Sequence, residues 1–288
     1  MKRRDFLKSA FGATLAVPFV ASTRAAETPF HATDRIVLGP RKIECCRMFI
    51  GTGSHGFRKS SSQTRGLGIE GLKDMLLDGY RLGLTSWDSA DNYGSHPSLK
   101  LAIEAGVPRE KVTILTKSFS RDPYSIRADI ERYLHELGTD TIDIFLFHCL
   151  EDPNWPRNMR GAMDVVNEFQ DRGIIRSKGV SCHSFGALKA AAKEPWVEID
   201  LARINPRGVV MDADTPSVVS VLREMKAAGK GVIGMKVLGN GQLASRADEC
   251  LEFVLNLDCV DAVTIGPENP SQLEDLVARI ARTPRAAV

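Results

Sequence analysis

Short apolar runs alternate with amphipathic stretches along most of the chain, starting near residue 45. Eight of the runs predict β-strands, at residues 46–50, 86–88, 113–116, 142–147, 177–180, 201–204, 231–235 and 262–265. Between them the apolar positions follow helical spacing, most clearly at Ile126, Ile130, Leu134 and Leu137. Other helices are expected to start near residues 69, 97, 159, 185, 215, 245 and 270. Because the run 142–147 is apolar on both faces, as buried parallel strands are, the pattern predicts an α/β protein with a parallel sheet.

Eight strand–helix units in a chain of 288 residues favour a (β/α)8 TIM barrel, formed by a single domain over residues 26–288. A doubly wound open sheet is the alternative, and it needs a glycine-rich phosphate loop that opens a helix after the first strand. Residues 51–56 read Gly-Thr-Gly-Ser-His-Gly, which matches the spacing of such a loop. Residues 57–63 are polar, however, and predict a loop where that motif requires a helix. The barrel is therefore the expected fold.

The first 25 residues differ in character from the rest of the chain. Lys2, Arg3 and Arg4 precede a stretch of small apolar residues, and Pro18 disfavours the alternative of a basic terminus leading into a first helix. Basic residues, a short apolar stretch and a small-residue end are typical of a secretory signal. Residues 1–25 resemble a twin-arginine (Tat) signal peptide. The resemblance implies the Tat export machinery as a partner and the periplasm as the destination.

Composition and charge exclude several classes of function. Of the residues, 43% are hydrophobic and 26% charged, as in ordinary soluble globular proteins. The formal charge of +2 comes from the N-terminus, because the first 25 residues hold five basic residues and one acidic residue and the remainder holds 33 and 35. A nearly neutral body without a basic run argues against a nucleic-acid partner. No apolar stretch reaches the ~20 residues that a membrane span needs.

Six cysteines are present, and no two of them form a Cys-x-x-Cys pair. Zinc and iron–sulfur sites therefore have little support, and no metal is expected. Cys45 and Cys46 are neighbours, and a disulfide between adjacent residues would be strained. Because folding before export would take place in a reducing compartment, most of the six are expected to be buried free thiols.

Polar residues stand where successive strands are expected to end. Asp88 ends the second strand, Lys117 the third and His148 the fourth, and Tyr93 follows Asp88 in the same loop. Each alone has an ordinary explanation as a cap, a packed ring or a surface charge. The carboxyl ends of all strands meet at one mouth of a barrel, where the chemistry of this fold takes place. The four side chains are therefore expected to gather there as a catalytic group.

The segments around these residues resemble the aldo-keto reductase family. Residues 87–94, Trp-Asp-Ser-Ala-Asp-Asn-Tyr-Gly, are similar to the family's signature around its catalytic Asp and Tyr. Residues 113–117 are similar to its lysine strand and residues 140–148 to its histidine strand. Residues 179–181 and 231–241 are similar to its cofactor-binding strand ends. The match stays in register over nearly the whole chain after the signal, and it implies a barrel oxidoreductase that uses NAD or NADP.

The resemblance assigns a role to each of the four residues. Tyr93 would give a proton to the carbonyl oxygen as the nicotinamide delivers hydride, and would take it back from an alcohol in the reverse direction. A free phenol titrates near pH ~10, so a cationic Lys117 beside it is expected to lower the pKa of Tyr93. Asp88 would hold Lys117, and His148 would orient a small-molecule carbonyl or alcohol substrate.

The resemblance also implies a set of cofactor-binding residues at later strand ends: Ser181, Asn205, Met235, Lys236, Gly239, Gly241 and Gly266. Ser181 and Asn205 would hold the nicotinamide carboxamide, although Cys182 replaces the usual Asn at its position. Met235 would cover the ring where many members stack a Tyr. Lys236 would reach the pyrophosphate, with a solvent-facing side chain as the alternative.

The adenosine end departs most from the family pattern. NADPH-dependent members place Lys or Arg in the segment that corresponds to residues 266–272, where they bind the 2′-phosphate. This segment has no basic residue, and Glu268 would repel a phosphate. NAD is therefore favoured over NADP.

Two other functions compete with the reductase. A non-catalytic barrel that keeps its pocket for binding or sensing would fit the altered cofactor segment, whereas retention of all four catalytic residues argues against it. A metal-dependent hydrolase needs clustered ligands, and of the six histidines only His148 and His183 fall at strand ends. An exported oxidoreductase of the aldo-keto reductase type is the expected function.

Overall fold

A computed structural model describes residues 29–286, so the expected export signal at residues 1–25 lies outside the described part. Eight parallel strands close into a barrel in the spatial order β10-β3-β4-β5-β6-β7-β8-β9. They are β3 (Met48–Gly51), β4 (Ser86–Asp88), β5 (Thr113–Ser118), β6 (Ile142–Leu150), β7 (Ile175–Cys182), β8 (Ile199–Arg203), β9 (Gly231–Met235) and β10 (Ala262–Ile265). The predicted (β/α)8 barrel is confirmed.

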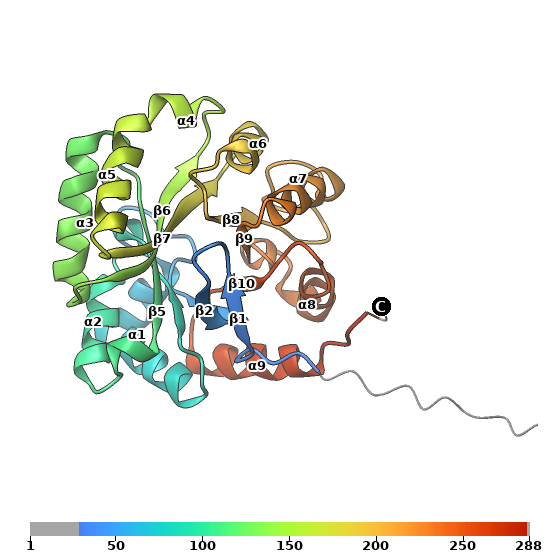
Figure 1. Cartoon of the computed structure of the whole chain (residues 1–288). Helices are drawn as coiled ribbons and strands as arrows, with labels where there is room; N and C mark the ends of the chain where they lie inside the picture. The colour runs from blue at the N-terminus through green and yellow to red at the C-terminus, as the bar shows by residue number, and fades with distance from the viewer. Residues whose placement is uncertain (1–28, 287–288) are drawn as a thin grey trace, which may run out of the picture.

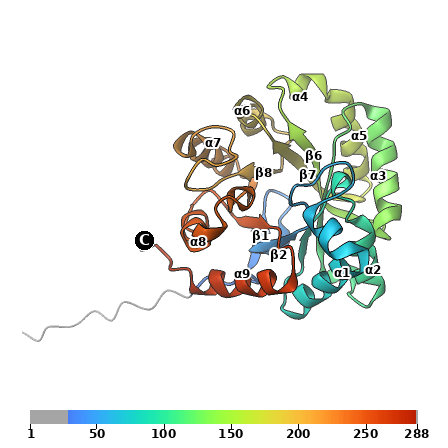
Figure 2. The same ribbon diagram turned by 180° about the vertical axis from the view of Figure 1, so that it is seen from behind.

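Helices surround the strands on the outside (Figure 1), and the view from behind shows the same ring (Figure 2). They are α1 (Ser62–Arg81), α2 (His96–Glu104), α3 (Pro123–Leu137), α4 (Trp155–Asn158), α5 (Arg160–Asp171), α6 (Phe185–Lys193), α7 (Thr215–Ala227), α8 (Ala247–Leu255) and α9 (Pro270–Arg282). None of the helices in residues 29–286 has the length and apolar character needed to cross a membrane.

Helix α3 shows how the sequence specifies these elements. Asp122 caps its first turn by accepting hydrogen bonds from two backbone N–H groups, and Gly138 ends it in the left-handed conformation at φ 63°. Ile126 and Ile130, two of the predicted apolar positions, are fully buried against the barrel. The predicted helical face is therefore confirmed.

The barrel has two apolar layers. Side chains that point inward, among them Phe49, Leu146 and Leu201, fill the interior. Side chains that point outward from the strands pack against the helices and form the larger cluster. This alternation explains why the strands are apolar on both faces.

A hairpin that the sequence pattern did not predict closes the end of the barrel where the strands begin. Its strands β1 (Arg35–Leu38) and β2 (Ile43–Cys46) pair antiparallel. Leu38 and Ile43 are buried and belong to the interior cluster. The predicted strand at 46–50 joined the end of β2 to β3, because both segments are apolar and only Arg47 separates them.

Helix α1 begins at Ser62, earlier than the predicted start near residue 69. Ser61 and Thr64 form a reciprocal capping box at its first turn, and a break at Gly68, with φ 68°, interrupts the helix. This first turn lies beside the barrel mouth and matters for the site described below. Elsewhere, all six cysteines are free thiols and all but Cys149 are buried, as expected.

Candidate active site

The four residues expected to form a catalytic group lie together at the barrel mouth. Lys117 is fully buried, and its Nζ forms an ion pair with Asp88 and donates to the carbonyl oxygen of Ser89 at 2.8 Å. The same Nζ lies 4.8 Å from the centre of the Tyr93 ring. Tyr93 Oη lies 3.3 Å from Nε2 of His148. Strands β4, β5 and β6 thus bring three side chains to the phenol carried by the short helix Asp91–Tyr93.

The backbone that carries Tyr93 is anchored by an ionic network. Asp91, at the start of the short helix, accepts from Arg132 of α3 at 2.7 Å and pairs with Lys59 at 2.9 Å. Arg132 also binds Glu136, which accepts from His96 at 2.7 Å. The ligand-type atoms of Asp91, His96 and Glu136 lie close together, but Arg132 already compensates both carboxylates. The cluster is accordingly a structural support for the tyrosine loop.

The pKa of Tyr93 corrects an expectation from the sequence. Burial raises it well above the ordinary value, and the negative charge of Asp88 adds to the rise. Lys117 was expected to lower this pKa, but its ion pair with Asp88 places a compensating negative charge beside the ring. Tyr93 is consequently a neutral phenol, which is the form that can donate a proton.

His148 is also neutral. Burial lowers its pKa well below the ordinary value, and the positive charge of Lys117 is the next largest cause. The side chain is 5% exposed, and its Nδ1 has no hydrogen-bond partner among the described residues. A neutral imidazole carries one N–H and one lone pair, so it can orient an oxygen next to Tyr93 without adding charge.

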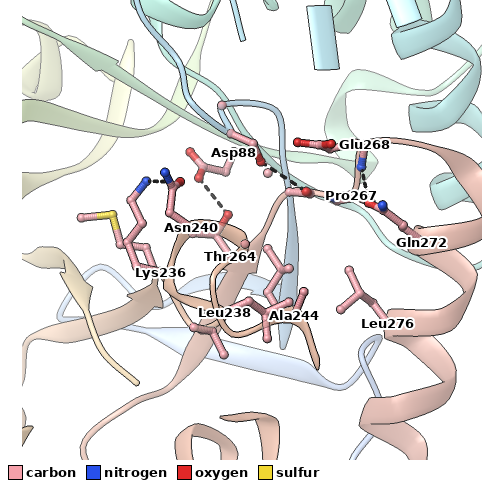
Figure 3. A pocket seen from close by; sticks show the side chains of 18 of the residues that line it. Asp88, Lys236, Leu238, Asn240, Ala244, Thr264, Pro267, Glu268, Gln272 and Leu276 are labelled. Atoms are coloured by element: carbon pink, nitrogen blue, oxygen red, sulfur yellow. Dashed lines mark hydrogen bonds between the residues drawn. The ribbon is translucent and has the colours of Figure 1, made fainter. Parts of the chain in front are cut away.

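A pocket of about 410 Å³ opens from this group toward α9. Figure 3 shows Asp88 and Lys236 at one end and Gln272 and Leu276 of α9 at the other. Thr264 of β10 lies between them and donates to the second carboxylate oxygen of Asp88 at 2.8 Å. The pocket is therefore elongated from the phenol to the outer helix, as an extended ligand requires.

Several of the expected cofactor-binding residues line this pocket. Met235, Lys236, Gly241 and Gly266 do so, and Nζ of Lys236 donates to Asn240 at 3.1 Å. The exposed alternative for Lys236 does not hold, because its side chain is half-buried in the pocket wall and burial lowers its pKa. Gly239 is buried and is not part of the lining. Ser181 is fully buried at the end of β7, and its Oγ has no partner among the described residues.

Asn205 does not take the position that the sequence suggested. Its amide nitrogen donates to the carbonyl oxygens of Val209 and Lys236, and its oxygen accepts from the backbone of Arg207 and Val209. All of its hydrogen-bonding capacity is used in holding the loop after β8. Leu201 of β8 lines the pocket instead. The expected carboxamide contact of Asn205 is therefore wrong, because its side chain serves the loop.

The sequence reasoning missed Arg279, which lines the adenosine end of the pocket. Its guanidinium donates to Asp275 at 2.6 Å and to Asp248 at 2.7 Å. Gln272, Asp275 and Arg279 repeat at helical spacing, so continuing the helix periodicity beyond residue 272 would have found it. With Glu268 nearby, this end of the pocket carries more negative than positive charge.

The residues present fit a nicotinamide dinucleotide. The elongated pocket joins the Tyr93 phenol to the outer helix. Ser181, at the end of β7, has a buried Oγ without a partner among the described residues, so it retains a hydrogen bond for a carboxamide. Gly266 in the pocket wall lets Ser54 and Gln63 pack closely against it, since a Cβ there would lie 2.6 Å from Ser54 Oγ and 2.8 Å from Gln63 Nε2. Lys236 offers a positive charge at the Asp88 end of the pocket.

Comparisons with known proteins agree with this geometry. The Aldo/keto reductase family model matches residues 50–250. Aldo-keto reductase AFTS1 of Alternaria alternata is 24% identical in an alignment 249 residues long that covers 73% of this chain and 66% of the relative. The NADH-specific methylglyoxal reductase of Escherichia coli K12 is 27% identical in an alignment 169 residues long that covers 51% of each chain. The match thus spans about half to two thirds of the length of these curated relatives.

Solved structures share the barrel. A homologue from Pseudomonas aeruginosa, assigned to the aldo-keto reductases, is 22% identical with a TM-score of 0.72, covering 89% of this chain and 98% of its own. The holo form of aldo-keto reductase AKR11C1 from Bacillus halodurans is 16% identical with a TM-score of 0.72, covering 88% and 92%. Given the extent of the family match and the grouped Asp88, Tyr93, Lys117 and His148, this chain belongs to the aldo/keto reductase family.

Proposed function

We propose that the protein is an oxidoreductase that transfers hydride between a nicotinamide dinucleotide and a carbonyl or alcohol substrate. The observation that carries the proposal is the 3.3 Å contact between Tyr93 Oη and His148 Nε2, above the buried ion pair of Lys117 with Asp88. A phenol, a neutral imidazole and a buried ammonium are the groups needed to bind a carbonyl oxygen and give it a proton.

A reduced nicotinamide would supply the hydride when bound. Negative charge would then develop on the carbonyl oxygen of the substrate, and Tyr93 Oη would give that oxygen its proton. The charge then resides on the phenolate, where the Lys117 ammonium beside the ring stabilises it. Because Asp88 fixes Lys117, the cation needs no rearrangement during the step. His148 holds the substrate oxygen within reach of Tyr93. In the reverse direction the phenolate accepts the alcohol proton.

Charge at the adenosine end supports a preference for NAD. Arg279 is the cation available there, and Asp275 and Asp248 already engage it. A 2′-phosphate would meet Glu268 and Asp275, and its desolvation would be poorly offset. Relatives include an enzyme named as NADH-specific and an indole-3-acetaldehyde reductase of Schizosaccharomyces pombe named as NAD/NADP-dependent. Both cofactor types therefore occur among similar proteins, and the local charge favours NAD in this one.

We also propose that the protein is exported by the Tat machinery and acts in the periplasm, on the basis of Arg3 and Arg4 before an apolar stretch. Free dinucleotide is expected to be scarce there. A cofactor bound during cytoplasmic folding would have to stay with the protein, which suggests a cycle in which one substrate reduces it and another reoxidises it.

A non-catalytic binding protein is the second candidate, favoured by one observation. Leu201 lines the pocket and Asn205 is used by its own loop, so Ser181 remains as the polar side chain of the expected set that could hold a carboxamide. Titration of the purified protein with NADH and NADPH, followed by a screen of carbonyls and alcohols, separates the two. Dinucleotide binding with turnover supports the reductase, and no binding of either dinucleotide supports the second candidate.

A further inference from the structure

The glycines of residues 51–56, which match the spacing of a phosphate loop, have another use here. A Cβ on Gly53 would overlap Cε2 and Cζ of the Tyr93 ring, and a Cβ on Gly56 would overlap its Cδ1. Neither glycine has a positive φ, so close approach to the ring and not backbone conformation excludes larger residues. The loop backbone therefore touches the tyrosine ring directly, and any shift of the loop moves the space in which the ring sits.

One buried amide holds this loop. Gln63, in the first turn of α1, is fully buried. Its Oε1 accepts from the backbone N–H of Ser54 at 3.0 Å, and its Nε2 donates to Ser54 Oγ at 2.9 Å. The same Nε2 donates to the carbonyl oxygen of Pro267 at 3.2 Å. Both hydrogens of the amide nitrogen are thus used, one on the loop of residues 51–56 and one on the pocket wall after β10.

The two ends of this bridge have different neighbours. Ser54 lies next to Gly53 and donates from its Oγ to the carbonyl oxygen of Gly266 at 3.3 Å. Gly266 and Pro267 line the pocket that would hold the dinucleotide. The neighbouring Thr64 also binds the backbone of Tyr93, since its Oγ1 donates to the carbonyl oxygen of Tyr93 at 3.3 Å. The first turn of α1 therefore contacts both the phenol-bearing segment and the proposed cofactor wall.

We propose that Gln63 is a positioning residue. By joining Ser54 to Pro267, it fixes the position of the Tyr93 phenol relative to the pocket wall that would hold the dinucleotide. It does not touch the reacting atoms. Proton donation requires the phenol oxygen to lie within hydrogen-bond reach of the substrate oxygen, and errors of about 1 Å cost about 100-fold in rate. The inference rests on the proposed reductase function, in which Tyr93 donates the proton.

The test compares two buried glutamines. Gln63→Met keeps the side-chain length and removes the bridge. Gln170→Met is the matched control, because Gln170 is also buried and hydrogen-bonded, to Glu198 and Lys178, but belongs to α5 and lies outside the pocket. Gln63→Met should lower kcat by about 10-fold or more, change the Kd for NADH by less than about 3-fold, and leave substrate KM nearly unchanged. Gln170→Met should lower Tm while keeping kcat.

Two results overturn the inference. One is a Gln63→Met protein whose kcat stays within twofold of the wild type while its Tm falls, because the amide then serves stability alone. The other is an unchanged kcat with an NADH Kd weakened about 10-fold, because Gln63 then acts on cofactor binding. Tyr93→Phe separates this inference from the proposed function. Full turnover by Tyr93→Phe contradicts the proposed function, whereas an inactive Tyr93→Phe beside a normal Gln63→Met contradicts only the role of Gln63.

Discussion

The Asp88 carboxylate and the Lys117 ammonium form a buried ion pair beside the Tyr93 ring, so the phenol faces a cation whose charge is already balanced. This balance explains why burial raises the pKa of Tyr93 although a lysine lies 4.8 Å from the ring centre. The Lys117 cation stabilises the phenolate when the phenol loses its proton, because the new negative charge then lies next to a fixed positive charge. The arrangement suits an acid that is neutral before the reaction and stabilised as an anion after proton transfer.

Tyr93→Phe tests the proton donor. The ring would still fill the space beside Gly53 and Gly56, so the fold and dinucleotide affinity should be kept. Turnover should fall by about 100-fold or more, because the hydroxyl that gives the proton is removed. Steady-state kinetics on a substrate found by screening, with NADH titration, measures both quantities. Tyr124→Phe is the control, since Tyr124 is 86% exposed. Near-normal turnover by Tyr93→Phe would contradict the assignment of Tyr93 as the proton donor.

The pH dependence of kcat for reduction should reflect the fraction of Tyr93 that is protonated. Reduction needs protonated Tyr93, and because its pKa is raised in the folded protein, kcat should stay level through neutral pH and fall only above the ordinary phenol range. The pKa of His148 is lowered by burial, so no change of rate due to its protonation is expected between pH 6 and 8. A pH–rate profile of kcat checks this. An ionisation near pH 7 that persists in Tyr93→Phe but vanishes in His148→Gln would contradict it.

Removing one partner of the Asp88–Lys117 ion pair should lower the free energy of unfolding more than removing both partners. Lys117→Met leaves the Asp88 carboxylate buried without its partner, which costs about 3–5 kcal/mol for a pair of this kind. The double variant Asp88→Asn, Lys117→Met should recover part of that loss, because no uncompensated charge remains. Urea unfolding of the wild type, the single variants and the double variant gives the coupling free energy. Additive losses would show that the two charges do not interact.

NADH should bind at least as tightly as NADPH. The cation at the adenosine end, Arg279, is engaged by Asp275 and Asp248, and Glu268 adds a negative charge. Glu268→Lys should improve the NADPH affinity by about 10-fold, since a lysine gives the 2′-phosphate a cationic partner. Fluorescence titration with both dinucleotides measures the Kd values. Glu274→Lys is the control, because Glu274 lies outside the lining of this pocket. A strong preference of the wild type for NADPH would refute the charge argument.

Export should depend on the arginine pair. Replacing Arg3 and Arg4 with Lys keeps the charge but removes the feature that defines a twin-arginine signal. Full-length precursor should then accumulate in the cytoplasm, and immunoblots of fractionated cells would detect it. A matched variant, Lys2→Arg, should be processed as the wild type. Unimpaired processing of the lysine variant would favour a general secretory signal.

Much of the site was accessible from the sequence. Asp88, Lys117 and His148 each lie within two residues of the end of a strand, and closing parallel strands into a barrel must bring those ends to one mouth. Their grouping with Tyr93 followed from chain order and fold class together. The same logic failed at Asn205, because one strand end is followed by a loop whose own backbone groups compete for the amide. A local hydrogen-bond competition of this kind is invisible in a pattern of apolar residues.

The sequence by itself determined the barrel, because the alternation of apolar strands with amphipathic helices leaves few ways to bury both kinds of surface. It also determined which side chains meet at the mouth, because strand ends are set by the chain. Only the tertiary structure decided the state of those side chains. The raised pKa of Tyr93 comes first from its burial and then from the charge of Asp88, and the packing of Gly53 against its ring depends on a close approach between separate loops. The charge at the adenosine end likewise depends on Arg279 meeting Asp248 from another helix. These effects arise from distances between segments that are remote in sequence, and folding sets those distances.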